Sequence, residues 1–232
     1  MNEQYSRTIS LLGEENFNRL QQATVLIVGV GGVGGTALEC LARSGIKNFI
    51  IIDKDIVDIS NLNRQLLFTR EDITKSKVEC AQNHLLKIND SINVIPLEIF
   101  LDENNVNILN QYKIDFIIDA IDSIYSKLAL IKYAQENKIK FVISLGMGKR
   151  MNPSDLILTS LNKSTGDPLA KKLRYLLKQE NIDISHIKCV YSKEEVLVEG
   201  QRTPSSMMMV PSACGLLLAK ECIDNLIRKE EL

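Results

Sequence analysis

The chain has 232 residues, 45% of them hydrophobic, which is enough for one sizeable α/β core. Its formal net charge of −1 gives no overall positive field for nucleic acid, so any RNA contact must depend on a local patch. The N-terminus has no basic segment followed by an apolar one, and no apolar run reaches membrane-spanning length; we therefore expect a soluble, cytoplasmic protein.

Buried strands and helices alternate along the first two-thirds of the chain. Short β-branched runs predict the strands, and longer amphipathic segments between them predict the helices. We expect strands over residues 24–30, 49–53, 92–97, 115–119 and 140–145, and helices over 33–44, 74–87, 102–109 and 125–137. This alternation predicts an α/β fold with a Rossmann-like, doubly wound, mostly parallel sheet.

The pattern changes after Gly146. We expect strands over residues 155–159, 187–191 and 206–210, a basic helix over 168–179 and a closing helix over 213–229. These strands are expected to extend the sheet in antiparallel fashion. We interpret residues 1–232 as a single domain, with a core over 1–146 and an extension of the same domain over 147–232. The methionines of Met207-Met-Met209 are interpreted as packing residues.

A glycine loop, Gly29-Val-Gly31-Gly32-Val-Gly34, follows the first strand and begins a helix. Its G-x-G-x-x-G spacing serves a tight turn, a close approach of phosphate to backbone, and a helix–sheet contact. The helix N-terminus adds free N–H donors and a partial positive charge. Asp53 ends the second strand, where a carboxylate can bind both ribose hydroxyls, and we place Asp55 in the same nucleotide site. A glycine turn that only packs helix on sheet is the alternative.

The long loop over residues 54–73 contains Asn61-Leu-Asn-Arg64-Gln65. Arg64 follows the second strand and is therefore expected at the carboxyl edge of the sheet, where such folds bind ligands. Its guanidinium can bind phosphate oxygens in a forked pair, and Asn61 and Gln65 could orient the same oxygens. The alternative is a solvated loop arginine.

Two further charged residues are expected at this edge. Lys77 begins the next helix and could neutralise charge on a leaving pyrophosphate, whereas Lys75 is expected to be solvated. In Asp119-Ala-Ile-Asp122, we assign Asp122 to Mg²⁺ bound with ATP, and Asp119 to a structural role at the strand end. Asp122 could also, or instead, cap the helix that starts at Ser123.

Positive charge gathers in the extension. A patch that binds the phosphates of a nucleic acid and a solvated charged face are equally compatible with these residues. The basic residues concerned are Lys149, Arg150, Lys171, Lys172, Arg174 and Lys178.

The five cysteines form no C-x-x-C pair and the chain has two histidines, so we expect no zinc site and reduced, packed thiols. The cysteines are Cys40, Cys80, Cys189, Cys214 and Cys222.

The glycine loop, Asp53, the 61–65 segment, Lys77 and the 119–122 segment together resemble the ubiquitin-activating-enzyme-like (ThiF/MoeB/HesA) adenylating enzymes. The 119–122 segment and several further segments, the last three of them outside this core, resemble one branch, the tRNA threonylcarbamoyladenosine dehydratases. These segments are Tyr5-Ser-Arg-Thr8, Gly146-Met-Gly148, Asp167-Pro-Leu-Ala170, residues 190–195, and Val210-Pro-Ser212 with Gly215. The stretch between Glu195 and Ser205 is shorter than is usual in the branch.

The resemblance implies an enzyme that uses ATP to activate the carboxylate of N6-threonylcarbamoyladenosine in tRNA, followed by ring closure with loss of AMP. It implies ATP and Mg²⁺, with a monovalent cation as a further candidate, and a homodimer with sulfur-transfer accessory proteins as candidate partners. Arg64, Lys77 and Asn61 would bind the phosphates, Asp53 the ribose, and Asp122 would orient ATP and Mg²⁺. Arg7, otherwise expected to be a solvated arginine, would reach across the dimer into the partner's ATP site.

Three other functions stay open. Activation of the C-terminal Gly-Gly of a sulfur-carrier protein would use the same ATP site. A nicotinamide-dependent oxidoreductase would leave Arg64 and Lys77 without a role. A nucleotide-dependent scaffold would bind ATP without turnover.

Overall fold

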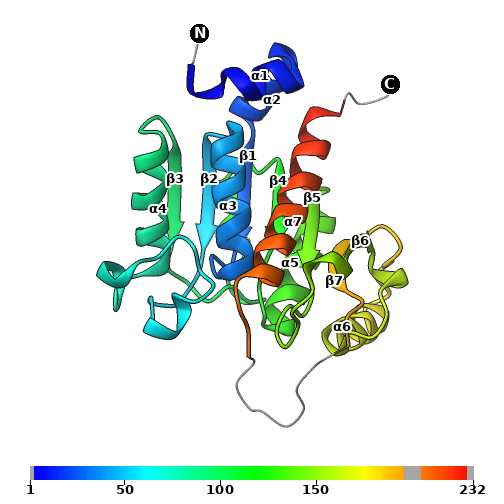
Figure 1. Ribbon diagram of the computed structural model, residues 1–232. Coiled ribbons are helices and arrows are strands. Elements are labelled where there is room, and N and C mark those ends of the chain that lie inside the picture. Colours follow the sequence, from blue (N-terminus) through cyan, green and yellow to red (C-terminus); the bar gives the residue numbers. More distant parts are fainter. Residues whose placement is uncertain (1–2, 196–204, 229–232) are drawn as a thin grey trace.

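The computed structural model describes residues 3–195 and 205–228, and within these ranges seven strands form one sheet (Figure 1). The strands are β1 (Thr24–Val28), β2 (Asn48–Ile52), β3 (Asn93–Leu97), β4 (Phe116–Asp119), β5 (Lys140–Ser144), β6 (Leu156–Ser160) and β7 (Lys188–Ser192). Their order is β3-β2-β1-β4-β5-β7-β6, and only the β6–β7 pairing among these is antiparallel. The predicted mostly parallel sheet with an antiparallel extension is therefore confirmed.

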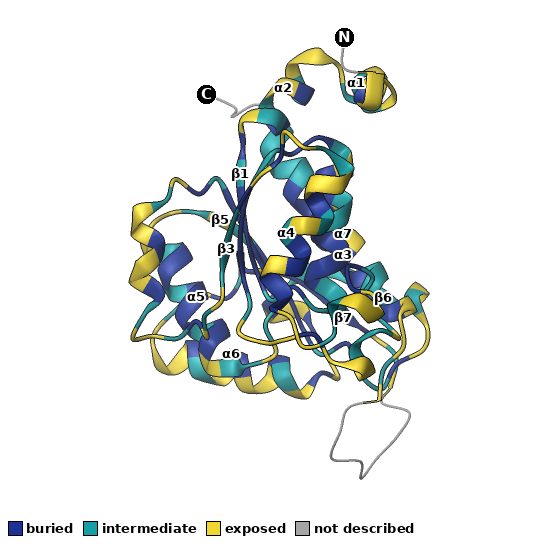
Figure 2. Ribbon diagram, turned by 90° about the vertical axis from the view of Figure 1, so that its left-hand side faces the viewer, coloured by how far each residue is buried: buried dark blue, intermediate teal, exposed yellow. Residues whose placement is uncertain are grey.

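Helices cover both faces of the sheet (Figure 2). The α-helices are α1 (Ser6–Leu12), α2 (Glu14–Gln22), α3 (Gly32–Ser44), α4 (Lys77–Ile88), α5 (Ile124–Glu136), α6 (Pro168–Gln179) and α7 (Met209–Ile227). The 3-10 turns are η1 (Glu3–Tyr5), η2 (Ile59–Asn61), η3 (Arg70–Asp72), η4 (Val106–Gln111), η5 (Pro153–Asp155) and η6 (Leu161–Lys163). None of the described helices combines the length and apolarity needed to cross a bilayer.

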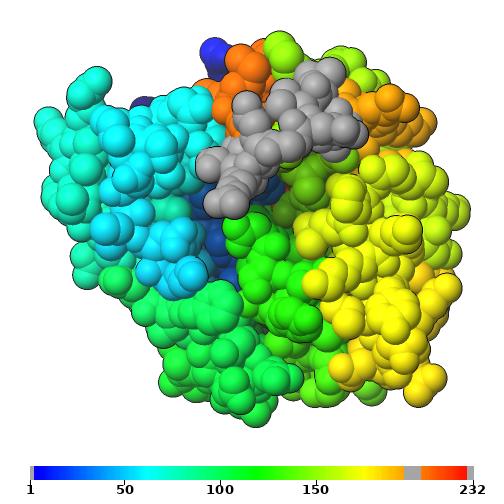
Figure 3. Space-filling view, turned by 90° about the horizontal axis from the view of Figure 1, so that it is seen from below, coloured from blue at the N-terminus to red at the C-terminus, as the bar shows by residue number. Residues whose placement is uncertain are grey.

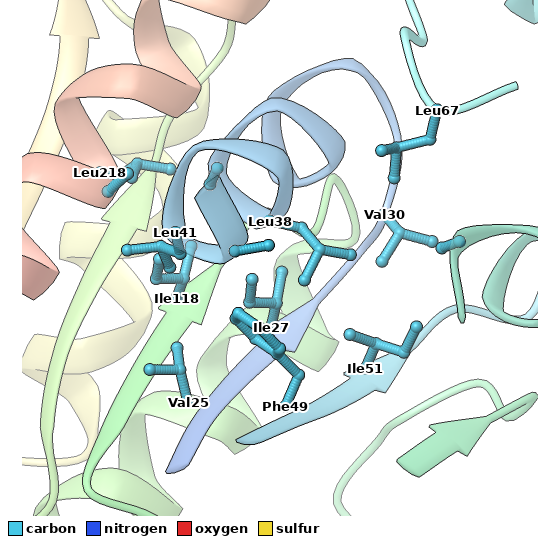
Figure 4. Close-up of a cluster of buried hydrophobic side chains, with 14 of the residues drawn as sticks. Val25, Ile27, Val30, Leu38, Leu41, Phe49, Ile51, Leu67, Ile118 and Leu218 are labelled. Carbon is cyan, nitrogen blue, oxygen red and sulfur yellow. The ribbon is translucent and has the colours of Figure 1, made fainter. Parts of the chain in front are cut away.

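Strand residues alternate between two apolar layers, as the period of two requires. Val25 and Ile27 of β1 belong to the layer of α3, α4 and α7, in which Leu38 lies beside Ile27 and Leu218 beside Leu41 (Figure 4). Leu26 of β1 belongs to the opposite layer, which contains residues of α5 and η4. A third cluster joins β5 and β7 to α6. Because inner strands are buried on both faces, they read in the sequence as continuous apolar runs.

One predicted strand and one interpretation are wrong. The expected strand over 206–210 does not exist: no strand is present there, and α7 begins at Met209. A short apolar run cannot by itself distinguish a strand from a helix start, and Pro211 sits in the first helical turn, where its missing N–H costs nothing. Met207, Met208 and Met209 are 41–45% exposed, so they are not packing residues. The single-domain interpretation, with its division at residue 146, stays a prediction.

A buried ion pair ends β4. Lys127 of α5 places its Nζ 2.7 Å from Oδ1 of Asp119, and the two side chains are 0% and 1% exposed. Oδ1 also accepts a 3.0 Å hydrogen bond from the amide of Ile121. The predicted structural role of Asp119 is therefore confirmed. Burial raises the pKa of Asp119, and the Lys127 ammonium acts against that rise.

We predict that Lys127→Met destabilises the fold by about 3–5 kcal/mol at pH 8, because it leaves a buried carboxylate without its cation. Without Lys127, the folded-state pKa of Asp119 rises further above its unfolded value. The folded variant then holds a proton that the unfolded chain releases, so its stability increases as the pH falls through that raised pKa. Urea unfolding at pH 5 and pH 8 should show a smaller deficit at pH 5.

Lys132→Met, on the same helix, is the control for this prediction. It removes the partner of Glu180 in a pair whose side chains are 37% and 40% exposed. Such pairs contribute at most about 1 kcal/mol. Equal deficits for Lys127→Met at the two pH values would contradict the assigned role of Asp119.

Candidate active site

The glycine loop joins β1 to α3 by contacts that leave no room for side chains. Gly29 has φ +88°, and a Cβ on it would lie 2.7 Å from the carbonyl oxygen of Ala120. A Cβ on Gly34 would lie 1.8 Å from the carbonyl oxygen of Gly29. At Gly31, which precedes α3, the nearest atom to such a Cβ is Nε2 of Gln65 at 3.6 Å. Gly29 and Gly34 thus hold the turn and Gly31 has room beside it, whereas a Cβ on Gly32 would lie 3.2 Å from both the Arg64 carbonyl oxygen and Pro211.

A cavity of about 310 Å³ lies at the carboxyl ends of β1, β2 and β4. Figure 3 views this end of the molecule, and blue atoms appear at the bottom of a hollow beside the cyan and green segments. The cavity wall contains every predicted nucleotide-binding residue except Gly34, namely Gly29, Gly31, Gly32, Asp53, Asp55, Asn61, Arg64, Gln65, Lys77 and Asp122. Sequence positions far apart therefore meet at one site.

The carboxylate of Asp53 is held in place by two amides. Its Oδ2 accepts from the amide of Val30 at 2.9 Å, and its Oδ1 accepts from the amide of Asp55 at 3.0 Å. Burial raises the pKa of Asp53. Each carboxylate oxygen has a further lone pair, so this fixed group can also accept from a pair of ligand hydroxyls.

Lys77 points into the site from the first position of α4. Its side chain is 6% exposed, and Nζ lies 2.9 Å from Oδ2 of Asp55, whose side chain is 51% exposed. The amide of Lys77 also donates to the carbonyl of Asp55 at 3.0 Å. Lys77 is therefore not a solvated lysine, whereas Lys75 is exposed as predicted.

Arg64 and Gln65 lie on the loop that crosses the glycine turn. Nη1 of Arg64 donates to the carbonyl of Ser60 at 2.9 Å and to Oδ1 of Asn63 at 2.8 Å. These bonds engage one nitrogen of a guanidinium that has five N–H donors. Gln65 is 5% exposed, and its buried Oε1 has no hydrogen-bond partner among the described residues. Oδ1 of Asn61 accepts from the amide of Asp58 at 3.1 Å, which closes a capping box.

Asp122 is exposed and lies on the cavity wall, between β4 and α5. The alternative of a helix cap is wrong for Asp122, because the cap of α5 is Ser123, whose side chain accepts from the amide of Ser126. Asp55, also on this wall, is the other exposed carboxylate there. This donor set fits Mg²⁺, which binds one or two carboxylates together with substrate phosphates. Among the described residues, no three His, Cys, Asp or Glu side chains gather as a metal site.

Sequence reasoning missed an apolar wall of the cavity and one cation. Lys54 lies over the ring of Phe100, with Nζ 4.7 Å from the ring centroid. These residues carry no motif, and the segment after β3 gave no signal of a ligand. The missed residues are Val28, Ile52, Lys54, Ile99, Phe100, Leu101, Ala120, Ile121 and Ser126.

A second cavity of about 430 Å³ adjoins the first. The two share Gly32, Arg64, Ala120, Ile121 and Asp122 in their walls. The rest of the second wall comes from Val33 of α3, from the end of β5 and the loop after it, from α6, and from the start of α7 with the segment before it. These residues are Val33, residues 144–148, Leu169, Ser206 and Pro211. Arg64 and Asp122 thus stand where the two cavities meet.

The predicted basic patch is only partly at the surface. Arg150 is wrong as an RNA contact, because its side chain is 2% exposed and lies 3.4 Å from the Asp167 carboxylate. Arg174 donates from Nη1 to the carbonyl and hydroxyl of Ser164 at 2.9 and 2.6 Å, so it is also a structural residue. Three exposed lysines on α6, Lys171, Lys172 and Lys178, and the half-buried Lys149 stay as candidates.

Arg7 is exposed on α1, which Figure 1 places at the opposite end of the sheet from the cavities. It does not contribute to the site of its own chain.

The thiols are not placed as nucleophiles. Cys40 is partly buried, and the other four cysteines are buried. Burial raises the pKa of Cys189 to about 12 and raises the pKa of Cys222 and Cys214 as well. A thiol with such a pKa has almost no thiolate at neutral pH.

Comparison with known proteins agrees with this geometry. The tRNA threonylcarbamoyladenosine dehydratase of Bacillus subtilis is 31% identical, with 99% of this chain and 96% of that protein covered. The Escherichia coli protein of that name is 35% identical over 84% of this chain and 75% of its own length. A crystal structure of the E. coli enzyme in complex with ATP has a TM-score of 0.91, covering 97% of this chain and 93% of that one.

A probable molybdopterin-synthase adenylyltransferase of Porphyra purpurea is 44% identical, but over 56% of this chain and 34% of its own length. The sequence model of the ThiF family matches residues 5–232. The chain therefore belongs to the ThiF family, in the branch of the tRNA threonylcarbamoyladenosine dehydratases.

Proposed function

We propose that this chain is an ATP-dependent enzyme that converts N6-threonylcarbamoyladenosine in the tRNA anticodon loop to its cyclic form through an acyl-adenylate. The junction of the two cavities at Arg64 and Asp122 carries this proposal. ATP in the first cavity would present its α-phosphate to a carboxylate in the second. The similarity to the tRNA threonylcarbamoyladenosine dehydratase of Bacillus subtilis, and to the ATP complex of the E. coli enzyme, supports this proposal.

In the first step, a carboxylate oxygen of the substrate attacks the α-phosphorus, and the bond to pyrophosphate breaks. Arg64 is the group at the junction that would stabilise the charge on the α-phosphate, and Lys77 would stabilise the pyrophosphate. Asp53 would hold the ribose, and the first turn of α3 would face the phosphates. Mg²⁺ held by Asp122 would bind phosphate oxygens and offset their charge.

In the second step, a nitrogen of the same substrate attacks the acyl carbon, AMP leaves with the carboxylate oxygen, and the nitrogen loses its proton. The nucleophile is already tethered, so this ring closure gains from proximity and needs no enzyme thiol. The raised pKa of the buried Cys189 agrees with that.

The proposal also covers the oligomeric state of the protein and its tRNA-binding surface. We propose a homodimer in which Arg7 of one protomer enters the partner's ATP site, because α1 lies away from the site of its own chain. We also place tRNA along α6, whose Leu169 lines the second cavity and whose lysines are exposed. A cytoplasmic location, a monovalent cation and sulfur-transfer accessory proteins stay predictions.

Activation of a sulfur-carrier protein is the second candidate. The adenylyltransferase of Porphyra purpurea supports it over the nucleotide-binding part of the chain. Pyrophosphate exchange that depends on a carrier protein, with no change in tRNA, would favour this second function.

The first prediction from the proposed function concerns turnover of threonylcarbamoylated tRNA. Purified protein with ATP, Mg²⁺ and threonylcarbamoylated tRNA should give a nucleoside lighter by one water in mass spectrometry. Arg64→Ala should reduce this rate by about 10²–10³-fold, because it removes a charged donor from the junction of the cavities. Arg70→Ala, an exposed arginine of the same loop, is the control and should retain activity. Unchanged tRNA with wild-type protein and bound ATP would refute the proposed function.

A second prediction distinguishes two lysines that are two residues apart. Lys77→Ala should lower kcat by about 10²-fold or more, since it removes the buried ammonium beside the triphosphate. Lys75→Ala should leave kcat unchanged, because Lys75 is exposed outside the cavity. Single-turnover release of pyrophosphate measures the step directly. Equal losses in the two variants would contradict the assignment of Lys77.

A third prediction concerns the tRNA surface. Replacing Lys171, Lys172 and Lys178 together by alanine should weaken tRNA binding and reduce the slope of log K against log salt by about two to three. ATP affinity should not change, because these lysines lie outside the ATP cavity.

The control for the tRNA surface replaces three lysines at the other end of the sheet. Lys87, Lys113 and Lys140 are exposed, and Lys140 begins β5. Their triple alanine variant removes the same charge, so an equal change in salt slope would show that α6 is not the tRNA surface.

A further inference from the structure

Asp167 and Arg150 enclose the main chain of Gly146 from both sides. The amide of Gly146 donates to Oδ2 of Asp167 at 3.1 Å, and Nη1 of Arg150 donates to the carbonyl of Gly146. Nη1 and Nη2 of Arg150 each lie 3.4 Å from the same Oδ2. We call these three residues the Gly146 clamp. It fixes both hydrogen-bonding groups of one residue in the loop after β5.

The two oxygens of Asp167 have separate tasks in the Gly146 clamp. Oδ1 caps α6 by accepting from the amide of Ala170 at 2.8 Å, while Oδ2 holds Gly146. The approach is so close that a Cβ on Gly146 would lie 3.1 Å from Oδ2. Only a carboxylate of this length offers two acceptor oxygens, one for each element. Asp167 therefore ties the first turn of α6 to the loop after β5.

Both elements form walls of the second cavity. Gly146, Met147 and Gly148 line it from the loop, and Leu169 lines it from the first turn of α6. Asp167 and Arg150 are not in the wall of the ATP cavity. The Gly146 clamp can therefore affect the second cavity without touching the nucleotide.

A contribution to stability does not by itself explain why Arg150 and Asp167 form a buried ion pair. The side chains of Arg150 and Asp167 are 2% and 1% exposed, and Nε of Arg150 is buried without a partner among the described residues. Removing two charges from water is costly, and apolar side chains of similar volume often stabilise as well or better. The buried pair is better explained by its position, because it holds the loop at Gly146 against the first turn of α6.

We propose that Asp167 and Arg150 are positioning residues that set the width of the second cavity for the acyl group carried by tRNA. This inference rests on the proposed function, because that function places the acyl group there. Neither side chain contacts the reacting atoms.

Asp167→Asn tests the proposal. Asparagine keeps the shape but has one acceptor oxygen, so it can cap α6 or hold Gly146, not both. We expect the KM for threonylcarbamoylated tRNA to rise about tenfold at saturating ATP, because the cavity wall shifts. The Kd for ATP and the kcat at saturating tRNA should stay close to the wild-type values. Arg150→Lys, which keeps the charge but loses the fork, should raise the same KM.

Asp224→Asn is the matched control, since it removes the carboxylate of an ion pair with Lys220 whose side chains are 62% and 33% exposed. It should change neither KM nor kcat. A lower melting temperature for Asp167→Asn with unchanged KM would overturn the proposal and leave the Gly146 clamp a purely structural device. A parallel loss of ATP affinity would overturn it as well.

Hydrogen exchange separates this inference from the proposed function. In Asp167→Asn, amides over residues 145–150 should exchange faster, while those of the glycine loop over 29–34 should not. If wild-type protein leaves the tRNA unchanged, the proposed function fails, whatever the exchange of these amides. If wild-type protein is active and the exchange over 145–150 is the same in both proteins, the positioning role fails while the proposed function stands.

Discussion

The contact between Gly34 and Gly29 is the constraint on which the site depends. The first turn of α3 packs so closely on the end of β1 that a Cβ at residue 34 would lie 1.8 Å from the Gly29 carbonyl. Gly29 in turn lies against the Ala120 carbonyl, so the end of β1 is tied to the segment that bears Asp122. On the other side of α3, a Cβ on Gly215 of α7 would lie 2.4 Å from the carbonyl of Val33. The absence of a side chain at these three glycines thus lets β1, α3, α7 and the segment with Asp122 approach one another beside the two cavities.

Around that turn, the charges are fixed before any ligand arrives. Asp53 is held by two amides, and the nearly buried Lys77 is paired with the half-exposed Asp55. The two partners of this pair differ in solvation: the Lys77 ammonium is removed from water, whereas the Asp55 carboxylate remains in contact with it. A phosphate that replaces the carboxylate of Asp55 gains the desolvated ammonium, while Asp55 returns to water at little cost. Under the proposed function, a phosphate of ATP would therefore take the place of the Asp55 carboxylate at Lys77.

Much of this arrangement could be predicted from the sequence, because its signals are local. The glycine spacing, the acid at the end of β2 and the alternation of buried strands with helices each depend on a few neighbouring residues. The assignment of Arg150 and Arg174 to an RNA surface failed because tertiary packing decides the partner of an arginine, which here is Asp167 or Ser164. The apolar wall with Phe100 was missed for the same reason, since it becomes a wall only when β3 lies beside β2. The strand expected over 206–210 failed where a short apolar run fits either structure.

The two cavities also explain why the cysteines can stay buried. An enzyme that passes an activated acyl group to a second molecule gains from a thiol that holds the group in between. In the proposed reaction the attacking nitrogen belongs to the molecule that was activated, so the intermediate needs only to be held in place and kept from water. The described thiols agree with that chemistry: burial raises the pKa of Cys189 to about 12, and no described cysteine lies in the walls of either cavity. Under the proposed function, selection of the acyl group then depends on the wall of the second cavity, where Asp167 ties the loop after β5 to the first turn of α6.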